Sequence, residues 1–356
     1  MAGAGPVRLG LIGIGRAGWG MHCPELKGKE DKFRFAAACD LLRGRRDKMA
    51  AAYGCKVYEK VENLVADPEV EMVDIASRSN DHFDHAILAL KAGKHVFLEK
   101  PICETYAQAR RIQAAAAKAK GRLYIRHNCR CDKVFLHVRE IIASGILGSV
   151  YQVKLLRGWY ARRDDWQTLK RFGGGLLLNW GPHMVDHALQ LLESPVKRLW
   201  SDLKRIAALG NAEDCCKIVI QGANGRIVDL EVSGGAALGG PEYLVWGTRG
   251  SLQAAGSSIT VRYIDPKAKL PPRKLNPGDP GEAFGSPENL PWIEQTFAAS
   301  PEHPWNIWDE LYAAIREGKR FPITAQQAVA VMQVISAAKK GTRFERRARR
   351  RNSARR

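Results

Sequence analysis

Residues 7–18 read VRLGLIGIGRAG, in which a short apolar run ends at a G-x-G-x-x-G pattern. The apolar run predicts a buried strand, and the residues after the glycines continue in a helical pattern. Glycines at these positions allow a tight turn and let backbone N–H groups approach a pyrophosphate. The strand–loop–helix order therefore predicts a dinucleotide-binding loop. The residues expected to contact the cofactor in this loop are Gly13, Ile14, Gly15, Arg16, Ala17 and Gly18.

A carboxylate follows the second apolar run, residues 35–39. Asp40 lies 22 residues after Gly18, where an acidic side chain accepts hydrogen bonds from the adenosine ribose and repels a 2′-phosphate. The sequence therefore predicts NAD in preference to NADP. Arg43 and two further arginines within the next three residues oppose this preference, because guanidinium groups could meet a 2′-phosphate.

Strands and helices alternate along the first third of the chain. Such alternation predicts a parallel sheet with right-handed crossovers and helices on both faces. Residues 1–126 are therefore expected to form an α/β Rossmann domain. The predicted strands are 7–12, 35–39, 72–76, 95–98 and 123–126, and the predicted helices are 43–53, 62–66, 82–92 and 105–120.

The pattern changes after residue 126. Consecutive strands separated by glycine-containing turns predict an α+β domain with an open, mostly antiparallel sheet over residues 127–340. Residues 266–304 are rich in proline and glycine and are expected to form a long ordered excursion. The predicted strands are 150–157, 218–221, 227–232, 243–247 and 258–263, and the predicted helices are 134–144, 181–192, 306–317 and 325–340.

The composition is that of a folded protein of one or two domains: 45% of the 356 residues are hydrophobic and 26% are charged. There is no run of about 18 apolar residues and no export signal at the start, so the sequence predicts a cytoplasmic protein without a membrane span. The formal net charge is +19, and residues 341–356 hold eight arginines and one glutamate. These residues are predicted to be a disordered basic tail, with non-specific nucleic-acid binding as the alternative role.

The eight cysteines include no C-x-x-C pair. Without metal-ligand spacing or an export signal, they are interpreted as reduced thiols, and no metal site is predicted. The basic body of the protein suits anionic ligands but selects none of them, and no specific nucleic acid is expected as a partner.

A Glu99-Lys100-Pro101 triplet follows the predicted strand 95–98, at the end of the sheet where open parallel sheets bind ligands. Together with the glycine loop, this triplet resembles the Gfo/Idh/MocA family of glucose–fructose oxidoreductases and inositol dehydrogenases. Two further stretches resemble family motifs: residues 77–82, SRSNDH, and residues 173–186, GGGLLLNWGPHMVD. The resemblance runs from about residue 7 to residue 340 and also includes the start of the last helix, FPITAQQA at 321–328.

The resemblance implies an active site between the two domains and a hydride transfer between a sugar or cyclitol hydroxyl and the nicotinamide. Lys100 would hydrogen-bond to the reacting hydroxyl, and His183 would be the general base, because an imidazole titrates near working pH. The alternatives are a surface lysine and a structural histidine at a helix start. The other expected cofactor contacts are Arg43, Ser77, His82 and Glu99, in addition to Lys100 itself.

Asn179 departs from the family pattern, in which many members have Asp four residues before the histidine. An amide can hydrogen-bond to His183 or to the substrate, but it cannot stabilise an imidazolium as a carboxylate would. Asn179 is therefore counted with Lys100 and His183 in the predicted catalytic set. Asp186 is either the acid that replaces the missing carboxylate or a packing residue.

Residues 158–170, GWYARRDDWQTLK, place aromatic rings beside charged groups, as carbohydrate pockets do. Tyr160 and Trp166 are predicted to contact the substrate, although a buried Trp166 that pins the loop is an equal alternative. Asn128 and Arg130, just after the last Rossmann strand, are expected to face the same cleft.

The sequence favours an NAD-dependent oxidoreductase acting on a CH–OH group of a sugar, glycoside or polyol, in carbohydrate metabolism. Two alternatives remain: a glycosidase that uses bound NAD for oxidation, elimination and reduction, and a nicotinamide-binding regulatory protein without catalysis. An open sheet leaves one broad face uncovered, so a homo-oligomer, either a dimer or a tetramer, is expected.

Overall fold

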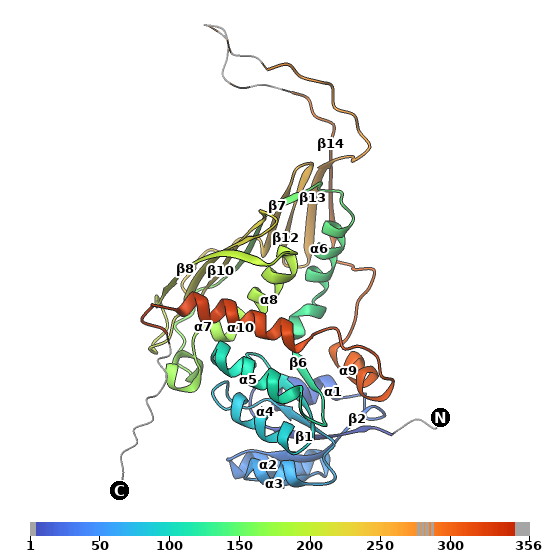
Figure 1. The fold of residues 1–356 in the computed structure, drawn as a ribbon, viewed down its shortest axis with the longest axis vertical. Coiled ribbons are helices and arrows are strands. Elements are labelled where there is room, and N and C mark those ends of the chain that lie inside the picture. The colour runs from blue at the N-terminus through green and yellow to red at the C-terminus, as the bar shows by residue number, and fades with distance from the viewer. Residues whose placement is uncertain (1–4, 276–277, 279–280, 282–284, 286–287, 346–356) are drawn as a thin grey trace.

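The computed structural model describes residues 5–275, 278, 281, 285 and 288–345. Figure 1 shows a lower half built on one sheet and an upper half built on a second, with helices between them. Most of the basic tail predicted at 341–356 lies outside the described residues. Among the described residues, no helix is long and apolar enough to cross a membrane.

The first sheet has six parallel strands in the order β3-β2-β1-β4-β5-β6. The order reverses between β1 and β4, and this switch point opens a crevice at the carboxyl ends of the strands. The α/β Rossmann prediction is confirmed. The strands are β1 Val7–Ile12, β2 Phe33–Cys39, β3 Lys56–Tyr58, β4 Met72–Ile75, β5 His95–Glu99 and β6 Leu123–Arg126.

The helices of this half begin directly after the glycine loop, where a π-helical turn leads into a short α-helix. The helix α5 starts at a capping box in which Thr105 and Gln108 satisfy each other's backbone N–H groups. The elements are the π-helix η1 Gly18–His22, α1 Cys23–Leu26, α2 Arg43–Tyr53, α3 Val61–Ala66, α4 His82–Lys91 and α5 Tyr106–Ala116.

The second sheet has eight strands in the order β14-β13-β12-β11-β7-β10-β9-β8. Only β7 and β10 pair in parallel, so the prediction of a mostly antiparallel sheet is confirmed. The strands are β7 Val150–Gly158, β8 Val196–Lys204, β9 Cys215–Gly222, β10 Ile227–Ser233, β11 Tyr243–Gly247, β12 Gly250–Ala255, β13 Ser258–Ile264 and β14 Trp292–Ala298.

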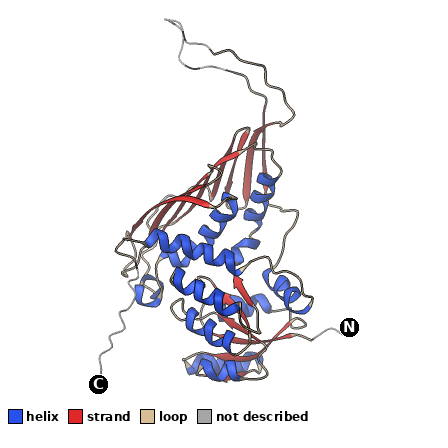
Figure 2. Ribbon diagram, in the orientation of Figure 1, coloured by secondary structure: helices blue, strands red, loops and turns tan. Residues whose placement is uncertain are grey.

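Helices cover one face of this second sheet, the face that looks toward the Rossmann half (Figure 2). The helix α10 also packs on α5, so it joins the two halves. The elements are the 3₁₀ turns η2 Asn128–Cys131, η3 Trp166–Thr168 and η4 Lys170–Phe172, with α6 Lys133–Ala143, α7 Leu176–Asn179, α8 Gly181–Leu192, α9 Ile307–Arg316 and α10 Ala325–Lys339.

The sequence prediction missed four strands, β3, β8, β12 and β14. The excursion expected over residues 266–304 contains one of them, β14, which pairs antiparallel with β13 along its whole length. Little in the sequence indicates β14, because it is an edge strand with no fully buried side chain.

The helix α9 returns to the Rossmann half. Trp308 is fully buried there, with ring centroids 5.4 Å from Phe33 and 5.0 Å from Phe97. Asp309 on the same helix pairs with Lys29 and Lys32. The C-terminal part of the chain therefore stabilises the first sheet as well as the second. The domain boundary at residue 126 stays a prediction from the sequence.

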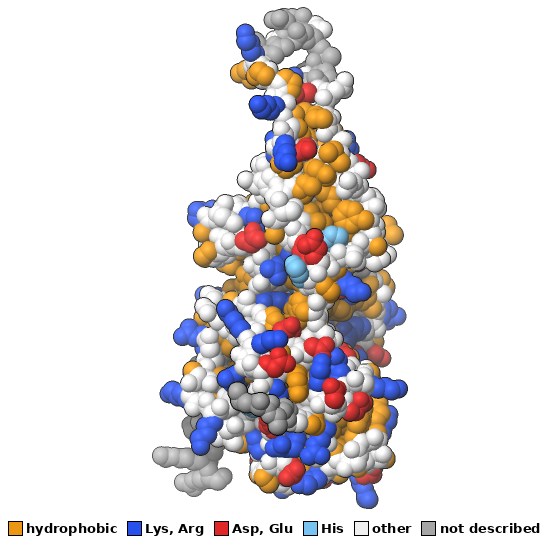
Figure 3. Space-filling model, turned by 90° about the vertical axis from the view of Figure 1, so that its right-hand side faces the viewer, with side chains coloured by type: hydrophobic (Ala, Val, Ile, Leu, Met, Phe, Trp, Pro, Cys, Tyr) orange, Lys and Arg blue, Asp and Glu red, His pale blue; other side chains and the backbone are white. Residues whose placement is uncertain are grey.

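The surface of the Rossmann half is rich in basic side chains. On the face shown in Figure 3, Lys and Arg are spread over the lower part of the molecule, and hydrophobic side chains gather higher up.

Candidate active site

The glycine loop after β1 has the shape that a dinucleotide needs. Gly13 has φ +94°, and a Cβ on it would lie 2.7 Å from the backbone N of Ser77. A Cβ on Gly18 would lie 2.1 Å from the carbonyl oxygen of Gly13. By contrast, the Cβ direction of Gly15 meets only the Arg45 guanidinium, at 3.7 Å. The loop is therefore closed toward the protein and open at Gly15, where a pyrophosphate would approach.

Asp40, at the end of β2, lies beside this loop. Its Oδ2 accepts from the backbone N–H of Ile14 at 2.9 Å, and its Oδ1 accepts from that of Leu42 at 2.9 Å. Arg45 donates to the same carboxylate at 3.2 Å, whereas Arg43 is exposed and lies 3.7 Å from Asp47. The residues thus fit a dinucleotide, and Asp40 also fixes the shape of the loop.

Ser77 follows the strand β4, and His82 is the first residue of the helix α4. The Oγ of Ser77 is 3.0 Å from the Nδ1 of His85. His82 is buried, with its Nδ1 2.7 Å from the Pro101 carbonyl and its Nε2 3.1 Å from the Ser77 carbonyl. Burial lowers the pKa of His82. Both ring nitrogens face backbone carbonyls, so His82 connects the loop after β4 to the loop after β5. Any effect of His82 on cofactor binding acts through these two loops.

Lys100 leaves β5 at its carboxyl end and reaches the second domain. Its Nζ donates to the backbone carbonyl of Asn179, at 3.2 Å. Burial lowers the pKa of Lys100, and the Glu99 carboxylate opposes this shift. The Oε2 of Glu99 accepts from the Lys100 backbone N–H at 2.9 Å, so the Glu99 carboxylate helps to fix the backbone of Lys100.

His183, on α8, is buried near Lys100, and its Nδ1 has no hydrogen-bond partner among the described residues. Burial and the positive charge of Lys100 lower its pKa well below the ordinary value. Two more buried polar groups close by have no partner in the described part of the chain: both ring nitrogens of His127 and the Oδ1 of Asn128. Such atoms are rare in folded proteins, and several of them together indicate where a polar ligand binds.

Sequence reasoning missed His127, although a signal was present. It follows the strand β6 directly, as Lys100 follows β5, and the register pairs Glu99 with Arg126 one residue earlier. Lys100 and His127 therefore leave neighbouring parallel strands at the same level. The rule that placed Lys100 at the ligand-binding edge applies to His127 as well.

Asn179 lies in the site, but its amide is turned away from His183. Its Nδ2 donates to the Oε1 of Gln167 at 2.7 Å, and Gln167 also accepts from Arg163. The expectation that Asn179 might hydrogen-bond to His183 is therefore not met by the described contacts. Gln167 is a second residue that the sequence did not single out.

The charge of Arg130 is paired with a carboxylate of the protein and is not free for a ligand in the cleft. It is buried and forms two 2.6 Å hydrogen bonds with the Asp186 carboxylate, while its third guanidinium nitrogen donates to Gln327 at 3.1 Å. Asp186 is thus the packing carboxylate of the two alternatives. The ion pair between Arg130 and Asp186 connects the turn η2, which directly follows His127, to the helix α8, which carries His183. It therefore helps to position these two histidines.

The two aromatic residues of the 158–170 loop lie in different surroundings. Trp166 lines a small pocket together with Lys100, Gln167 and Asn179. Tyr160 is 59% exposed, and its backbone forms an isolated bridge to Gly235. The structure therefore brings Trp166, but not Tyr160, next to Lys100.

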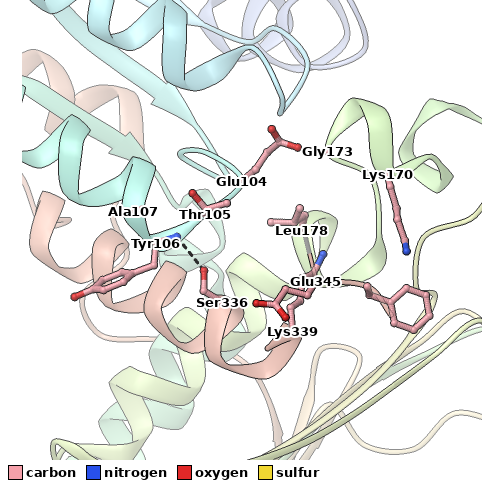
Figure 4. A pocket seen from close by; sticks show the side chains of 12 residues that line it. Glu104, Thr105, Tyr106, Ala107, Lys170, Gly173, Leu178, Ser336, Lys339 and Glu345 are labelled. Carbon is pink, nitrogen blue, oxygen red and sulfur yellow. Dashed lines mark hydrogen bonds between the residues drawn. The ribbon is translucent and has the colours of Figure 1, made fainter. Parts of the chain in front are cut away.

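A larger cavity of about 240 Å³ lies beside this pocket and shares Gly173, Gly174 and Leu178 with it (Figure 4). Its wall includes the start of α5, where the Tyr106 backbone N–H donates to Ser336. None of the residues predicted to be catalytic lines this larger cavity.

One ion pair crosses from the glycine loop to the second domain. The guanidinium of Arg16 donates to Asp165 at 2.8 Å, and Asp165 also accepts from Arg163 and from the backbone N–H of Gln167. The loop that carries Trp166 is therefore tied to the cofactor loop.

Both halves of the chain match known protein families. Residues 7–127 match the oxidoreductase family with an NAD-binding Rossmann fold, and residues 135–253 match the Gfo/Idh/MocA C-terminal domain. An uncharacterized oxidoreductase of Schizosaccharomyces pombe is 32% identical over 79% of this chain and 77% of its own length. The NADP⁺-dependent scyllo-inositol 2-dehydrogenase of Bacillus subtilis is 24% identical over 96% of this chain and 95% of its own length.

Solved structures agree on the fold. An NAD-binding protein from Listeria innocua superposes with a TM-score of 0.80 and 24% identity, over 95% of this chain and 98% of that one. The glycine loop, the Glu-Lys-Pro triplet and the two-sheet architecture agree with the sequence matches. The chain therefore belongs to the Gfo/Idh/MocA family of NAD-binding oxidoreductases.

Proposed function

We propose that the protein transfers a hydride between a hydroxyl-bearing carbon of a sugar, glycoside or polyol and the nicotinamide of NAD. The observation that carries the proposal is the group of buried polar side chains beside Lys100. Within the residues that the structure describes, polar atoms of His127, Asn128 and His183 have no hydrogen-bond partner. A hydroxyl both donates and accepts hydrogen bonds, so a polyhydroxylated ligand can satisfy a site of this kind.

Lys100 and His183 divide the proton work in this proposal. The ammonium of Lys100 hydrogen-bonds to the reacting oxygen and stabilises the negative charge that develops on it. His183 is neutral, because burial and Lys100 hold its pKa down, so it can accept the hydroxyl proton. The nicotinamide supplies the acceptor for the hydride. The C–H bond and the O–H bond break, and the carbon becomes a carbonyl.

The remaining predicted residues have supporting parts. Gly13, Gly15 and Asp40 form the cradle for the dinucleotide, and Trp166 offers an apolar face to the carbons of a sugar ring. Asn179 acts through Gln167 and through its carbonyl, which accepts from Lys100. That one relative is a scyllo-inositol dehydrogenase supports a cyclic polyol among the substrates.

A substrate screen tests this function. Monosaccharides, glycosides, inositols and their keto forms are offered with NAD and with NADP, and the absorbance of the reduced nicotinamide is followed. We expect turnover with at least one polyol or sugar. Binding of NAD without turnover of any hydroxyl or carbonyl compound would support the non-catalytic alternative. Release of a sugar from a glycoside without net cofactor reduction would support the glycosidase.

A further inference from the structure

A group of charged side chains lies fully buried behind Lys100, and the proposed chemistry does not use it. His22, at the end of the π-helix η1, has no exposed surface. Its Nδ1 is 2.8 Å from the Oδ2 of Asp74 in β4, and its Nε2 is 3.0 Å from the Oε1 of Glu99 in β5. The histidine thus bridges two carboxylates on neighbouring strands of the Rossmann sheet.

The group extends beyond this bridge. Arg126 at the end of β6 is fully buried, with its Nε 3.5 Å from Glu99 and a further ion pair to Glu25. The indole of Trp308, whose ring centroid lies 5.7 Å from that of His22, donates to the same Glu25 carboxylate at 2.7 Å. Three strands and three helices therefore contribute to one network, which ends at Glu99, the residue before Lys100, and reaches the surface at Glu25.

The charge of His22 follows from its partners. A neutral imidazole has one N–H, whereas an imidazolium has two, and both ring nitrogens here face carboxylate oxygens. Burial lowers the pKa of His22, but Asp74 and Glu99 outweigh it and raise the pKa to about 9. At neutral pH His22 is therefore an imidazolium held between two side-chain carboxylates, those of Asp74 and Glu99.

We propose that His22 is a positioning residue for Lys100, which fixes the Glu99 carboxylate and sets, through its charge, how tightly the Lys100 ammonium holds its proton. The inference rests on the proposed function, because it gives Lys100 its role there. Glu99 provides the link: one carboxylate oxygen faces His22, and the other accepts from the Lys100 backbone N–H.

The groups that act on Lys100 are few. Burial lowers its pKa, Glu99 raises it, and Arg126 lowers it. The other titratable neighbours are the buried thiol of Cys129 and the imidazoles of His127 and His183. A neutral residue at position 22 would leave Glu99 and Asp74 less compensated, and the Lys100 ammonium would be favoured. A neutral residue at position 74 would have the opposite effect as long as His22 keeps its second proton, which the Glu99 carboxylate still favours.

Two single substitutions with opposite predicted signs test this inference. His22→Gln keeps groups that can hydrogen-bond but removes the charge, so we expect the alkaline limb of the kcat/KM profile to move up by about one pH unit. Asp74→Asn should move the same limb down by a similar amount. The double variant should return it toward the original position. His95→Gln, a histidine at the opposite end of β5, is the matched control and should leave the profile in place.

The two single variants distinguish charge from structure, because a purely structural loss has no reason to act with opposite signs. Limbs that stay in place, or move in the same direction in both variants, would contradict the inference. Turnover that survives Lys100→Met would instead contradict the proposed function, whatever the profiles show. If His22→Gln does not fold, ¹⁵N NMR of the histidines in the unmodified protein decides the point. A neutral His22 at pH 7.5 would overturn the inference, and a doubly protonated ring would support it.

Discussion

Lys100 and His183 are the residues whose loss should affect the transition state most. Lys100→Met and His183→Ala should each lower kcat/KM by about 10²–10⁴-fold, the usual contribution of a positioned acid–base group. NAD affinity, measured by calorimetry, should change little, because most of the expected cofactor contacts lie in the glycine loop and at Asp40, and Lys100 is only one further contact. Lys91→Met, at an exposed position on α4, serves as the control. Near-normal turnover of His183→Ala would move the search for the base to His127.

Asp40 and Arg45 should control the choice between NAD and NADP. Asp40→Asn still accepts from the Ile14 N–H but loses the charge that repels a 2′-phosphate, so the preference for NAD should fall by about tenfold. Arg45→Gln should raise that preference, because the guanidinium that pairs with Asp40 is 47% exposed and can turn toward a phosphate. Dissociation constants for both cofactors measure the ratio, and a tighter hold on NADP by the unmodified protein would contradict the assignment.

His22 should make the stability of the protein depend on pH. Its folded pKa of about 9 lies above the ordinary value of 6.5, so its contribution is complete below pH 6.5 and is lost as the pH rises through 9. The shift corresponds to about 3 kcal/mol. Denaturant unfolding between pH 6.5 and 9 should show this loss, and His22→Gln should remove most of it. An unchanged slope in the variant would show that other groups cause the decline.

Among single residues, those that belong to sequence motifs were predictable, whereas side-chain contacts that depend on tertiary packing were not. The glycine loop, Asp40 and Lys100 follow from strand–loop order. By contrast, the burial of Arg130 against Asp186 and the turn of Asn179 toward Gln167 depend on how α7, α8 and η2 meet. No local pattern carries that information.

The loop between β7 and α7 can be tested directly by substitution, because it carries Trp166 and Asp165 ties it to the glycine loop. Asp165→Asn weakens the contacts to Arg16 and Arg163, which are partly exposed, so stability should fall by less than about 1 kcal/mol. The KM for the substrate should rise by about threefold to tenfold, because the loop is less well fixed. Asp164→Asn, at the exposed neighbouring position, should change neither quantity. Equal effects of the two substitutions would argue against the tie.

Elements with a strong period were predictable, and elements at edges were not. The strands β9 and β10 alternate buried and half-buried side chains, and the helix α8 has a continuous buried face. The strands β8 and β14, at the two ends of the sheet, bury almost nothing, and β12 is short and contains glycine and alanine. Their identity comes from pairing with a neighbour, which a single segment does not reveal.

The open face of the eight-stranded sheet bears on whether the protein forms oligomers. Trp200 is 58% exposed on β8, and it lies opposite Val219 of β9 in the register. Exposed apolar side chains on a broad sheet face favour association, so we expect a homo-oligomer. Light scattering at micromolar concentration should give a multiple of 39.5 kDa.

A charged residue on that face should weaken the assembly. Trp200→Glu places a carboxylate on the sheet, whereas Leu238→Glu changes a 90% exposed residue on a loop and serves as the control. A monomeric mass for the unmodified protein would contradict the prediction. Dissociation by the control variant alone would place the interface elsewhere.

The proposed function requires that a hydride pass directly between a hydroxyl-bearing carbon and the nicotinamide, in a site built on Lys100 and His183. Direct transfer is measured with a substrate from the screen that carries deuterium on the reacting carbon, followed by mass spectrometry of the reduced cofactor. We expect one deuterium in each reduced nicotinamide and loss of this transfer in Lys100→Met. Reduced cofactor without deuterium, or full transfer in the Lys100→Met variant, would contradict the proposed function.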